Sequence, residues 1–158
     1  MQNNQKIIAI FGGGGFLGKH LMRQLTKLDY RVKVATRNPY LKGYLKPLGN
    51  PGQIELFKTN IFNPEDVRQV LKNCDLVINL VGILYETRRQ KFDQIHSQFP
   101  YLLSNLCNEL GIKNLVLPPP IRGRNGENCA IVANVSKNLS EGPNTTEGLK
   151  IIEGLKLS

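Results

Sequence analysis

The fold is decided by the stretch Ile7-Ile8-Ala9-Ile10-Phe11-Gly12-Gly13-Gly14-Gly15-Phe16-Leu17-Gly18. A continuous apolar run ends in four glycines, and residues 19–25 (Lys-His-Leu-Met-Arg-Gln-Leu) then follow the pattern of an amphipathic helix. Glycines permit positive φ at a tight turn and let backbone N–H groups come close to a ligand. The helix that follows presents its partly positive amino end at the same place. A strand, a glycine turn and a helix in this order are typical of a pyrophosphate site.

The glycines fit two spacings of the dinucleotide-binding fingerprint. Gly13, Gly15 and Gly18 match GxGxxG, whereas Gly12, Gly15 and Gly18 match GxxGxxG. Such a pattern is weak by itself, and a merely tight turn is the alternative interpretation. Here the glycines follow a predicted strand and open a predicted helix, which is the context that the fingerprint requires. We therefore interpret the turn as a dinucleotide site.

Patterns further along the chain predict alternating strands and helices. Strands are expected at residues 6–11, 31–35, 53–58, 75–82 and 113–117. Helices are expected at residues 15–28, 63–73 and 91–110, the last with a kink or break at Pro100. This order predicts an α/β fold of the Rossmann-like, doubly wound type, with a parallel sheet of about five strands.

Three local features refine this prediction. A stripe of leucines at positions 17, 21, 25 and 28 is expected to face the core. Residues 40–52 contain too many prolines and glycines for a regular helix of more than about one turn. The alternation of apolar residues fails after Pro118, where only residues 131–133 resemble a short strand. We therefore expect a nucleotide-binding domain at residues 1–117 and an irregular, poorly ordered remnant at residues 118–158.

The end of the second strand predicts the type of dinucleotide. Arg37 lies about 20 residues after Gly18, where an acidic residue would bind the ribose 2′-hydroxyl of NAD. Acidic residues are absent between Asp29 and Glu55. A guanidinium makes charge-assisted contacts with a 2′-phosphate, so the sequence favours NADP(H) over NAD(H), with Thr36 and Lys42 as possible helpers. An exposed loop arginine is the alternative interpretation.

Two other strand ends are expected to line the same crevice, because ligands of such sheets bind outside the carboxyl ends of the strands. Asn60 and Ile61, after the third strand, are candidates for the adenine. Leu80, Val81 and Gly82, after the fourth strand, are candidates for the ribose and phosphates. We interpret Asn79 as a residue that satisfies backbone groups at the strand end.

Composition limits the other classes of function. The net charge is +9, and residues 1–117 carry 16 basic against 8 acidic side chains. This excess would suit a phosphorylated cofactor, an anionic membrane surface or only a solvated face, and no nucleic-acid-binding motif accompanies it. Cys74, Cys107 and Cys129 lack metal-binding or disulfide spacing, so we expect reduced thiols and no metal site. Without a signal sequence or a transmembrane stretch, we expect a cytoplasmic protein.

The machinery for reduction is incomplete. Reductases of this fold use a tyrosine as proton donor and a lysine one helical turn later, and no Tyr-x-x-x-Lys occurs in the chain. The leading hypothesis is therefore a cofactor-binding protein without catalytic residues. The alternatives are an NADP-dependent reductase or nucleotide-sugar epimerase/dehydratase-like enzyme, with an acid such as Tyr85 or one from a partner chain, and a truncated product without function.

Residues 10–18 resemble the GxxGFxG motif of the atypical, extended-type short-chain dehydrogenases/reductases. Residues 47–53, residues 77–82, and Glu86-Thr87 with Phe92-Asp93 are similar to the 39 kDa subunit family of NADH:ubiquinone oxidoreductase (complex I) and its bacterial homologues. The resemblance covers about residues 6–117. It implies a tightly held, mostly non-catalytic NADPH and a structural role beside a respiratory membrane complex, peripheral to the inner membrane.

The resemblance also assigns roles by position. It implies that Gly12, Gly15, Phe16, Leu17 and Gly18 hold the pyrophosphate and that Arg37 holds the 2′-phosphate. Asn60 and Ile61 would hold the adenine, and Leu80, Val81 and Gly82 the ribose side. The second half departs from the family: three prolines at 118–120 replace a Ser/Thr-bearing segment, and Glu141 and Thr145 fall where tyrosine and lysine are common. A C-terminally truncated member is therefore expected.

Overall fold

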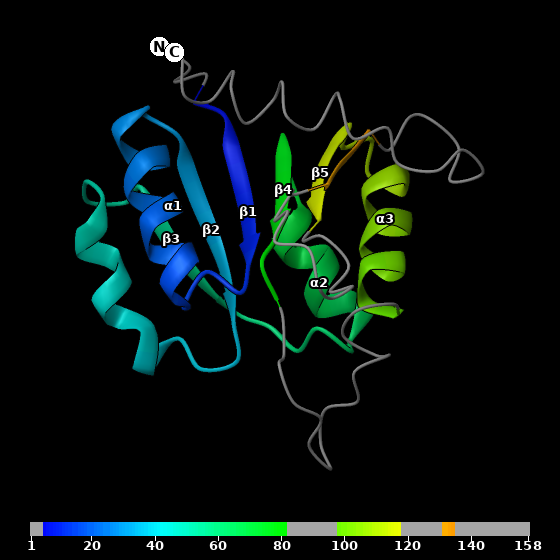
Figure 1. The fold of residues 1–158 in the computed structure, drawn as a ribbon. Coiled ribbons are helices and arrows are strands. Elements are labelled where there is room, and N and C mark those ends of the chain that lie inside the picture. Colours follow the sequence, from blue (N-terminus) through cyan, green and yellow to red (C-terminus); the bar gives the residue numbers. More distant parts are fainter. Residues whose placement is uncertain (1–4, 82–97, 118–130, 135–158) are drawn as a thin grey trace, which may run out of the picture.

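The computed structural model describes residues 5–81, 98–117 and 131–134 (Figure 1). Helices and strands alternate along this part of the chain, as the hydrophobic patterns predicted. Their order is β1 (Ile7–Phe11), α1 (Phe16–Lys27), β2 (Arg31–Thr36), η1 (Tyr40–Leu48), β3 (Ile54–Lys58), α2 (Pro64–Leu71), β4 (Leu76–Asn79), α3 (Phe99–Glu109), β5 (Asn114–Leu117) and β6 (Ile131–Asn134).

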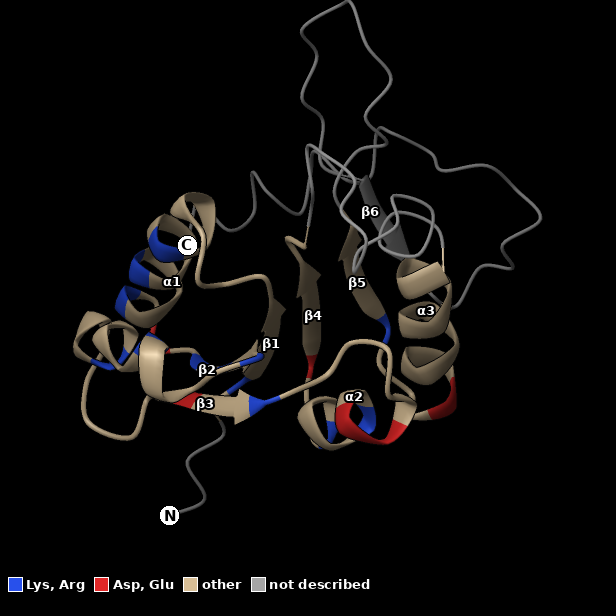
Figure 2. Cartoon of the chain, turned by 90° about the horizontal axis from the view of Figure 1, so that it is seen from below, with Lys and Arg blue, Asp and Glu red and all other residues tan. Residues whose placement is uncertain are grey.

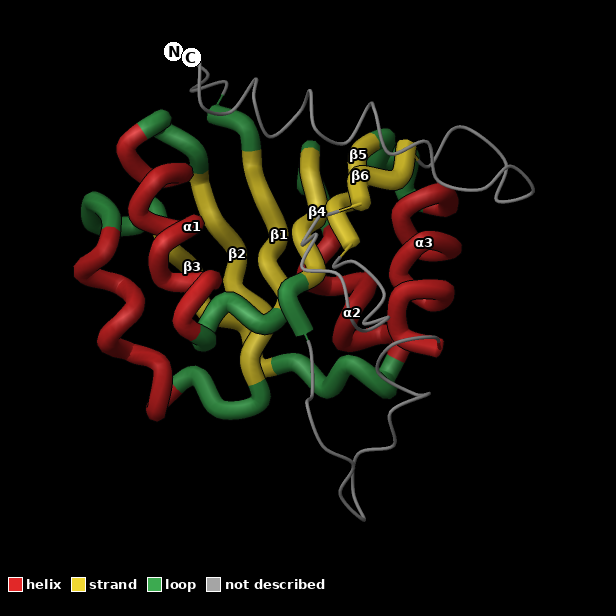
Figure 3. The backbone as a smooth tube through the Cα atoms, in the orientation of Figure 1, coloured by secondary structure: helices red, strands yellow, loops and turns green. Residues whose placement is uncertain are grey.

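The strands form one sheet in the order β3-β2-β1-β4-β5-β6. The first five are parallel, which confirms the Rossmann-like prediction, and β6 pairs antiparallel with β5. Residues 131–133 therefore do form a strand, although the boundary between the two expected domains stays a prediction. The carboxyl ends of β1, β2 and β3 and the loops that follow them lie at one edge of the sheet (Figure 3). Any site built from these loops lies there.

Charged residues are distributed unevenly over the helices on the two sides of this sheet (Figure 2). One apolar cluster joins α1 and η1 to one face, through Met22, Leu25 and Leu45. A second cluster joins α2 and α3 to the other face. Lys and Arg predominate on the first pair of helices, whereas Asp and Glu lie mainly on the second pair. Counted over these helices alone, the described part therefore has one basic and one acidic side.

The core-facing side of α1 differs from the predicted leucine stripe. Leu17 is 63% exposed, and of the four leucines only Leu25 is fully buried. The buried line instead runs through Gly18, Met22 and Leu25. Gly18 must face the turn because a side chain there would strike the backbone of Gly13. This contact fixes the rotation of the helix and leaves Leu17 on its outer side.

Two further expectations about helices were wrong in part. Residues 40–48 form a 3₁₀ helix of nine residues, longer than the single turn expected, because the fully buried Leu45 anchors it to the sheet. Pro100 lies in the first turn of α3, where a missing N–H costs no hydrogen bond, and does not mark a kink within the described helix. The rest of the expected helix, and the irregular remnant apart from β6, lie outside the described residues.

By contrast, the amino end of α2 follows the sequence signal closely. Asn63 caps the helix by accepting a hydrogen bond from the Glu65 N–H at 3.1 Å, and Pro64 follows in the first position. On the next turn, Arg68 forms ion pairs with Glu65 at 3.0 Å and with Glu109 of α3 at 3.1 Å. These pairs raise the pKa of the Arg68 guanidinium. The two acidic-side helices are thus tied together at their surface.

Gln53 holds the turn before β3 against the carboxyl end of α1. Its side-chain amide donates to the carbonyls of Thr26, at 2.8 Å, and Tyr30, at 3.0 Å, and its carbonyl accepts from Asn50 N–H at 2.9 Å. Thr26 adds a bond from its hydroxyl to the Leu48 carbonyl, and Gly49 leaves room for both side chains. This clamp gives a structural reason for the residue types at positions 49 and 53.

Replacing Gln53 with leucine is expected to lower the free energy of unfolding by about 2–3 kcal/mol. The substitution removes the Gln53 partner of the Tyr30 carbonyl and of the Asn50 N–H, and it leaves the Thr26 carbonyl with the Asp29 N–H alone. Gln69→Leu, an exposed position on α2, is the matched control and should change stability by no more than about 0.5 kcal/mol. Urea denaturation followed by circular dichroism measures both, and equal midpoints for the two variants would contradict the clamp.

Candidate functional site

The glycine turn after β1 is packed directly against the backbone that follows β4. Gly12 has φ of +79°, and a Cβ there would lie 2.7 Å from the Leu80 carbonyl carbon and 2.8 Å from Val81 N. The Leu80 N–H also donates to the Phe11 carbonyl at 2.7 Å. Glycine is therefore needed at position 12 both for its backbone angle and for lack of space. The turn and the end of β4 form one continuous backbone surface at the carboxyl edge of the sheet.

The start of α1 is equally tight on one side and open on the other. A Cβ at Gly18 would lie 2.3 Å from the Gly13 carbonyl oxygen, so the helix can approach the turn only without a side chain at this position. At Gly13 the space is limited by the side chains of Val34 and Ile10, at 3.0 and 3.2 Å. Gly15 is different, because its Cβ would meet only the Gly12 carbonyl oxygen, at 3.6 Å. Packing within the fold thus explains Gly12 and Gly18 but not Gly15.

The amino end of α1 has the properties of an anion site. Gly15 is the N-cap, no side chain caps the helix, and no acidic residue lies in its first turn. The first N–H groups of a helix have no partner within the helix, and the macrodipole adds about half a positive charge there. Phe16 and Leu17 are 82% and 63% exposed, so their side chains leave this end accessible. The residues present therefore fit a pyrophosphate, and its binding here stays a prediction.

Arg37 lies one residue beyond β2, at the same edge of the sheet as the glycine turn. It is exposed, and within the described part of the chain no ion pair or hydrogen bond engages its guanidinium. The neighbouring Thr36 hydroxyl accepts from the Asn38 N–H at 3.4 Å. The Asn38 side-chain carbonyl accepts from the Tyr40 N–H at 3.2 Å and from the Leu41 N–H at 3.4 Å, both at the start of η1. The loop after β2 is thus ordered by its own contacts and leaves the arginine available to a ligand.

The candidate adenine residues form a compact turn after β3. The Asn60 side-chain carbonyl accepts from Phe62 N–H at 3.1 Å, and its backbone N–H donates to the Asp66 carboxylate at 2.9 Å. Ile61 is half-buried and packs on the core cluster of the acidic side. The Asn60 amide nitrogen remains as a donor at the exposed edge. The turn is well defined, and whether it contacts adenine stays a prediction.

After β4, Asn79 performs the structural task expected of it. It is fully buried, and its side-chain carbonyl accepts from Val81 N–H at 3.0 Å. The Asn79 amide nitrogen has no hydrogen-bond partner among the described residues. Leu80 and Val81 are half-buried beside the Gly12 turn, whereas the third predicted residue of this group, Gly82, lies outside the described residues. Asn79 thus fixes the backbone that Gly12 packs against.

Beside the glycine turn lies a cluster of residues that the sequence analysis largely missed. The Lys42 side chain lies over Gly14, with its Cε 2.8 Å from the position of a Cβ there, and its ammonium donates to the Tyr44 hydroxyl at 3.3 Å. That hydroxyl donates to the Gly14 carbonyl at 3.3 Å, and the Lys19 ammonium lies 4.7 Å from the Tyr44 ring centroid. No sequence spacing links η1 to the turn, so only Lys42 had been considered.

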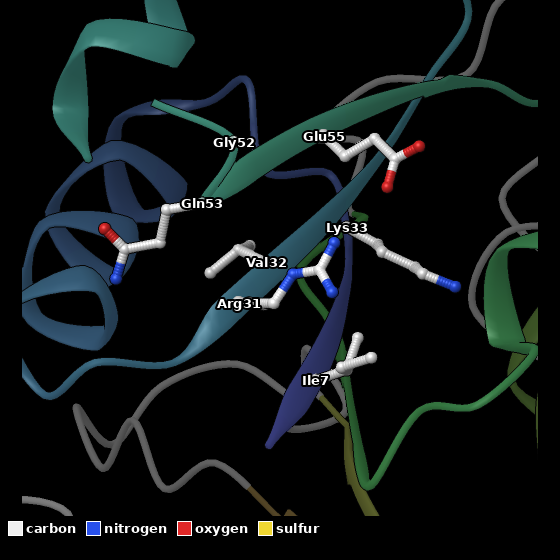
Figure 4. Close-up of a pocket in the computed structure, with 7 residues that line it drawn as sticks. All are labelled: Ile7, Arg31, Val32, Lys33, Gly52, Gln53 and Glu55. Carbon is white, nitrogen blue, oxygen red and sulfur yellow. The ribbon is translucent and has the colours of Figure 1, made fainter. Parts of the chain in front are cut away.

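Other features of the described residues offer no second site. A shallow hollow lies at the amino ends of β1 and β2 and beside β3, away from the glycine turn, and it has room for about one water molecule (Figure 4). In Figure 4 the Gln53 side chain points to α1, as the clamp requires. Groups of three or more His, Cys, Asp or Glu residues suited to a metal do not occur in the described ranges. No described helix is long and apolar enough to cross a membrane.

The two described cysteines are buried free thiols. Burial raises the pKa of the Cys74 thiol to about 11 and that of the Cys107 thiol to about 12. Both groups are therefore protonated at neutral pH and are poor nucleophiles. Cys74 donates to the Val70 carbonyl at 3.2 Å, which is a packing role. The third thiol, Cys129, lies outside the described residues, as does the alternative acid, Tyr85.

With the fold and the glycine turn established, comparison with known proteins decides the family. A sequence profile of the NAD dependent epimerase/dehydratase family matches residues 8–118, from β1 through β5. The chain belongs to this family. The match contains the glycine turn, Arg37 and the ends of β3 and β4.

Curated proteins similar to this chain include subunits of NADH dehydrogenase [ubiquinone]. The chain is 31% identical over 106 residues to NADH dehydrogenase [ubiquinone] 1 alpha subcomplex subunit 9, mitochondrial, of Arabidopsis thaliana, covering 66% of this chain and 26% of that protein. It is 24% identical over 111 residues to the Mus musculus subunit of the same name, covering 70% and 29%. The chain spans less than a third of the length of these relatives.

Solved structures share the fold. Pen from Bacillus thuringiensis superposes with a TM-score of 0.64 at 18% identity, covering 74% of this chain and 38% of that one. Uronate dehydrogenase from Agrobacterium tumefaciens, in a mutant form complexed with NAD, superposes with a TM-score of 0.54 at 21% identity. The match covers 68% of this chain and 38% of that one. At these identities the likeness concerns the fold alone.

Proposed function

We propose that this epimerase/dehydratase family member binds NADP(H) and does so without complete catalytic machinery of its own. The observation that carries the proposal is the uncapped amino end of α1 behind a glycine turn. Gly12, Gly13 and Gly18 keep the turn close to the helix, and Gly15 leaves the approach open. The pyrophosphate lies against this turn, with Phe16 and Leu17 beside it.

Arg37 selects the phosphorylated cofactor. Its guanidinium is free of protein partners in the described part of the chain, and a 2′-phosphate would give it two charge-assisted hydrogen bonds. The family is described by its dependence on NAD, and a structural neighbour was solved with NAD, so the preference for NADP(H) rests on this arginine. Asn60 and Ile61 hold the adenine, and Leu80, Val81 and Gly82 line the ribose.

A structural role is supported by the missing Tyr-x-x-x-Lys and by the names of the relatives, which are subunits of a respiratory complex. We place the protein in the cytoplasm, peripheral to a respiratory membrane complex or an anionic membrane surface. Residues 118–158 follow as a degenerate remnant of a second half.

A catalytic role is the second candidate, since one relative, from Dictyostelium discoideum, is named sterol-4-alpha-carboxylate 3-dehydrogenase, decarboxylating, at 25% identity. Oxidation of NADPH by a panel of carbonyl compounds would favour this candidate. No turnover above the rate without protein is the expected result, because the chain lacks the usual proton donor.

Replacing Arg37 with glutamine is expected to raise the Kd for NADPH by about tenfold or more, because each charge-assisted hydrogen bond contributes about 1.5–3 kcal/mol. The Kd for NADH should stay within about twofold, since NADH has no 2′-phosphate. Quenching of tyrosine fluorescence or calorimetry measures both values. Arg31→Gln, an exposed arginine at the opposite end of the same strand, is the matched control. An equal loss for both cofactors, or no loss for either, would contradict the role of Arg37.

A further inference from the structure

The basic excess of the described residues is concentrated on one layer of helices. α1 and η1 carry Lys19, Arg23, Lys27, Lys42 and Lys46 and contain no acidic residue. On the opposite face, α2 and α3 carry Glu65, Asp66 and Glu109 against a single cation, Arg68, which is paired with two of these acids. Figure 2 shows this separation. The five cations of α1 and η1 are called the basic layer.

The cations of α1 form a stripe on its outer side. Lys19, Arg23 and Lys27 are spaced four residues apart, so they lie one above the other on the helix, and all three are exposed. η1 lies in the same layer, since both elements pack on one apolar cluster and Lys19 lies 4.7 Å from the Tyr44 ring centroid. The basic layer is therefore a continuous surface contributed by two elements.

Exposed apolar side chains border this surface. Tyr40 is 96% and Leu41 72% exposed at the start of η1, and Phe16 is 82% exposed at the start of α1. Five of the eight large hydrophobic residues exposed in the described ranges belong to these two elements. Positive charge and apolar side chains thus gather on the same side, which a merely solvated basic face does not require.

We propose that the basic layer, with Tyr40 and Leu41 at its edge, docks on an anionic lipid bilayer. Lys and Arg side chains lie on the charged headgroups, and the tyrosine and leucine enter the boundary between headgroups and acyl chains. The acidic side, formed by α2 and α3, faces away from the membrane. The charge separation of the molecule therefore sets its orientation as well as its attraction.

A lipid surface suits this layer better than the other anionic partners. The side chain beside Tyr40 is an aliphatic leucine, which gains from burial in lipid but offers no planar face for stacking on a nucleobase. An acidic protein would have to present a groove or pocket shaped to receive these protruding side chains. A fluid bilayer accepts isolated apolar side chains without a shaped recess.

This docking deepens the proposed position beside a respiratory membrane, but its test does not depend on cofactor binding. The full-length chain is sedimented with vesicles of phosphatidylcholine alone and with vesicles containing one quarter phosphatidylglycerol. Binding to the mixed vesicles, and a loss of at least tenfold with neutral vesicles or at 0.5 M salt, is the expected result.

Two charge-matched variants locate the surface. The triple substitution Arg23→Gln, Lys27→Gln and Lys46→Gln should weaken partitioning about a hundredfold, at roughly fivefold for each cation near the membrane. Changing Lys6, Lys72 and Lys113 to glutamine removes the same charge from exposed positions outside the layer and should weaken it by no more than about threefold. Lys19 and Lys42 are left intact because they adjoin the glycine turn.

A third variant tests the apolar edge. Tyr40→Ser with Leu41→Ser should weaken partitioning about tenfold while the dependence on salt persists. NADPH binding and thermal unfolding, measured on every variant, should stay near those of the unchanged chain, which separates this proposal from cofactor binding. The proposal would be overturned if the two triple variants lost vesicle binding equally, or if the chain bound neutral and anionic vesicles equally. Binding only to an acidic protein or an oligonucleotide would also overturn it.

Discussion

Replacing Gly18 with alanine is expected to lower the free energy of unfolding by about 3 kcal/mol. Ordinary helix propensity would favour the alanine by about 1 kcal/mol at this position in α1. A Cβ would, however, lie 2.3 Å from the carbonyl oxygen of Gly13, so the helix must move away from the turn. Overpacking against rigid backbone costs about 1–3 kcal/mol and sometimes more. Because the contact here is unusually short, we take a cost of about 4 kcal/mol, which leaves a net loss of about 3 kcal/mol. The clash therefore outweighs the propensity.

Gly43→Ala is the matched control, because nothing lies within 4 Å of a Cβ at this exposed position in η1. It should leave stability unchanged or raise it by up to about 0.5–1 kcal/mol, because alanine lowers the conformational entropy of the unfolded chain. Chemical denaturation of both variants gives the comparison. A Gly18→Ala protein as stable as the unchanged chain would show that α1 does not need this close approach.

Replacing Gly15 with aspartate is expected to separate stability from cofactor binding. Position 15 is the N-cap of α1 with φ of −83°, and a Cβ there meets only one atom at 3.6 Å. An aspartate therefore fits, caps the helix and interacts favourably with the macrodipole, which should raise stability by about 0.5 kcal/mol. The same carboxylate faces the proposed pyrophosphate, so the Kd for NADPH should rise about a hundredfold through like-charge repulsion.

Gly15→Asn is the control, since asparagine is almost isosteric with aspartate and also caps helices well. It should bind NADPH more weakly than the unchanged chain but at least tenfold more tightly than the aspartate variant. The difference in affinity between these two variants measures the effect of the negative charge alone. Calorimetry measures the affinities, and thermal unfolding without cofactor measures stability. Equal affinities of the aspartate and asparagine variants for NADPH would show that the pyrophosphate does not bind at this helix end.

The sequence predicted the parallel sheet because its signals are local. Each of these signals depends only on residues close to it in the sequence. The structure confirms the strands expected from the apolar runs, the Asn63 cap and the glycine turn. Leu17 was wrongly predicted to face the core, whereas Leu21 and Leu25 do face it, because the start of α1 obeys a long-range constraint, the contact between Gly18 and the Gly13 carbonyl. A leucine stripe alone does not contain that information. Glycine positions in such a turn therefore say more about helix orientation than the apolar pattern does.

The surroundings of the site were harder to predict. Lys42 and Tyr44 reach Gly14 only because the buried Leu45 anchors a 3₁₀ helix beside the turn. Residues 47–53 are similar in sequence to a known family. The structure shows that the last of them, Gln53, binds the carbonyls of Thr26 and Tyr30 at the end of α1. Arg37 and Asn60 could be placed at the correct edge of the sheet from topology. Their contacts with a cofactor could not be predicted, because the spacing of residues in the sequence does not show how a ligand would lie.

The central claim is that the glycine turn and the first turn of α1 hold the cofactor pyrophosphate. Titration of the ¹⁵N-labelled chain with NADPH, followed by amide chemical shifts, tests it most directly. We predict that the largest shifts fall on the amides of Gly13, Gly15, Phe16, Leu17 and Gly18, while Gly52 and Gly111, in turns elsewhere, stay unchanged. Saturable shifts centred away from this turn, or no shifts at millimolar NADPH, would contradict the claim.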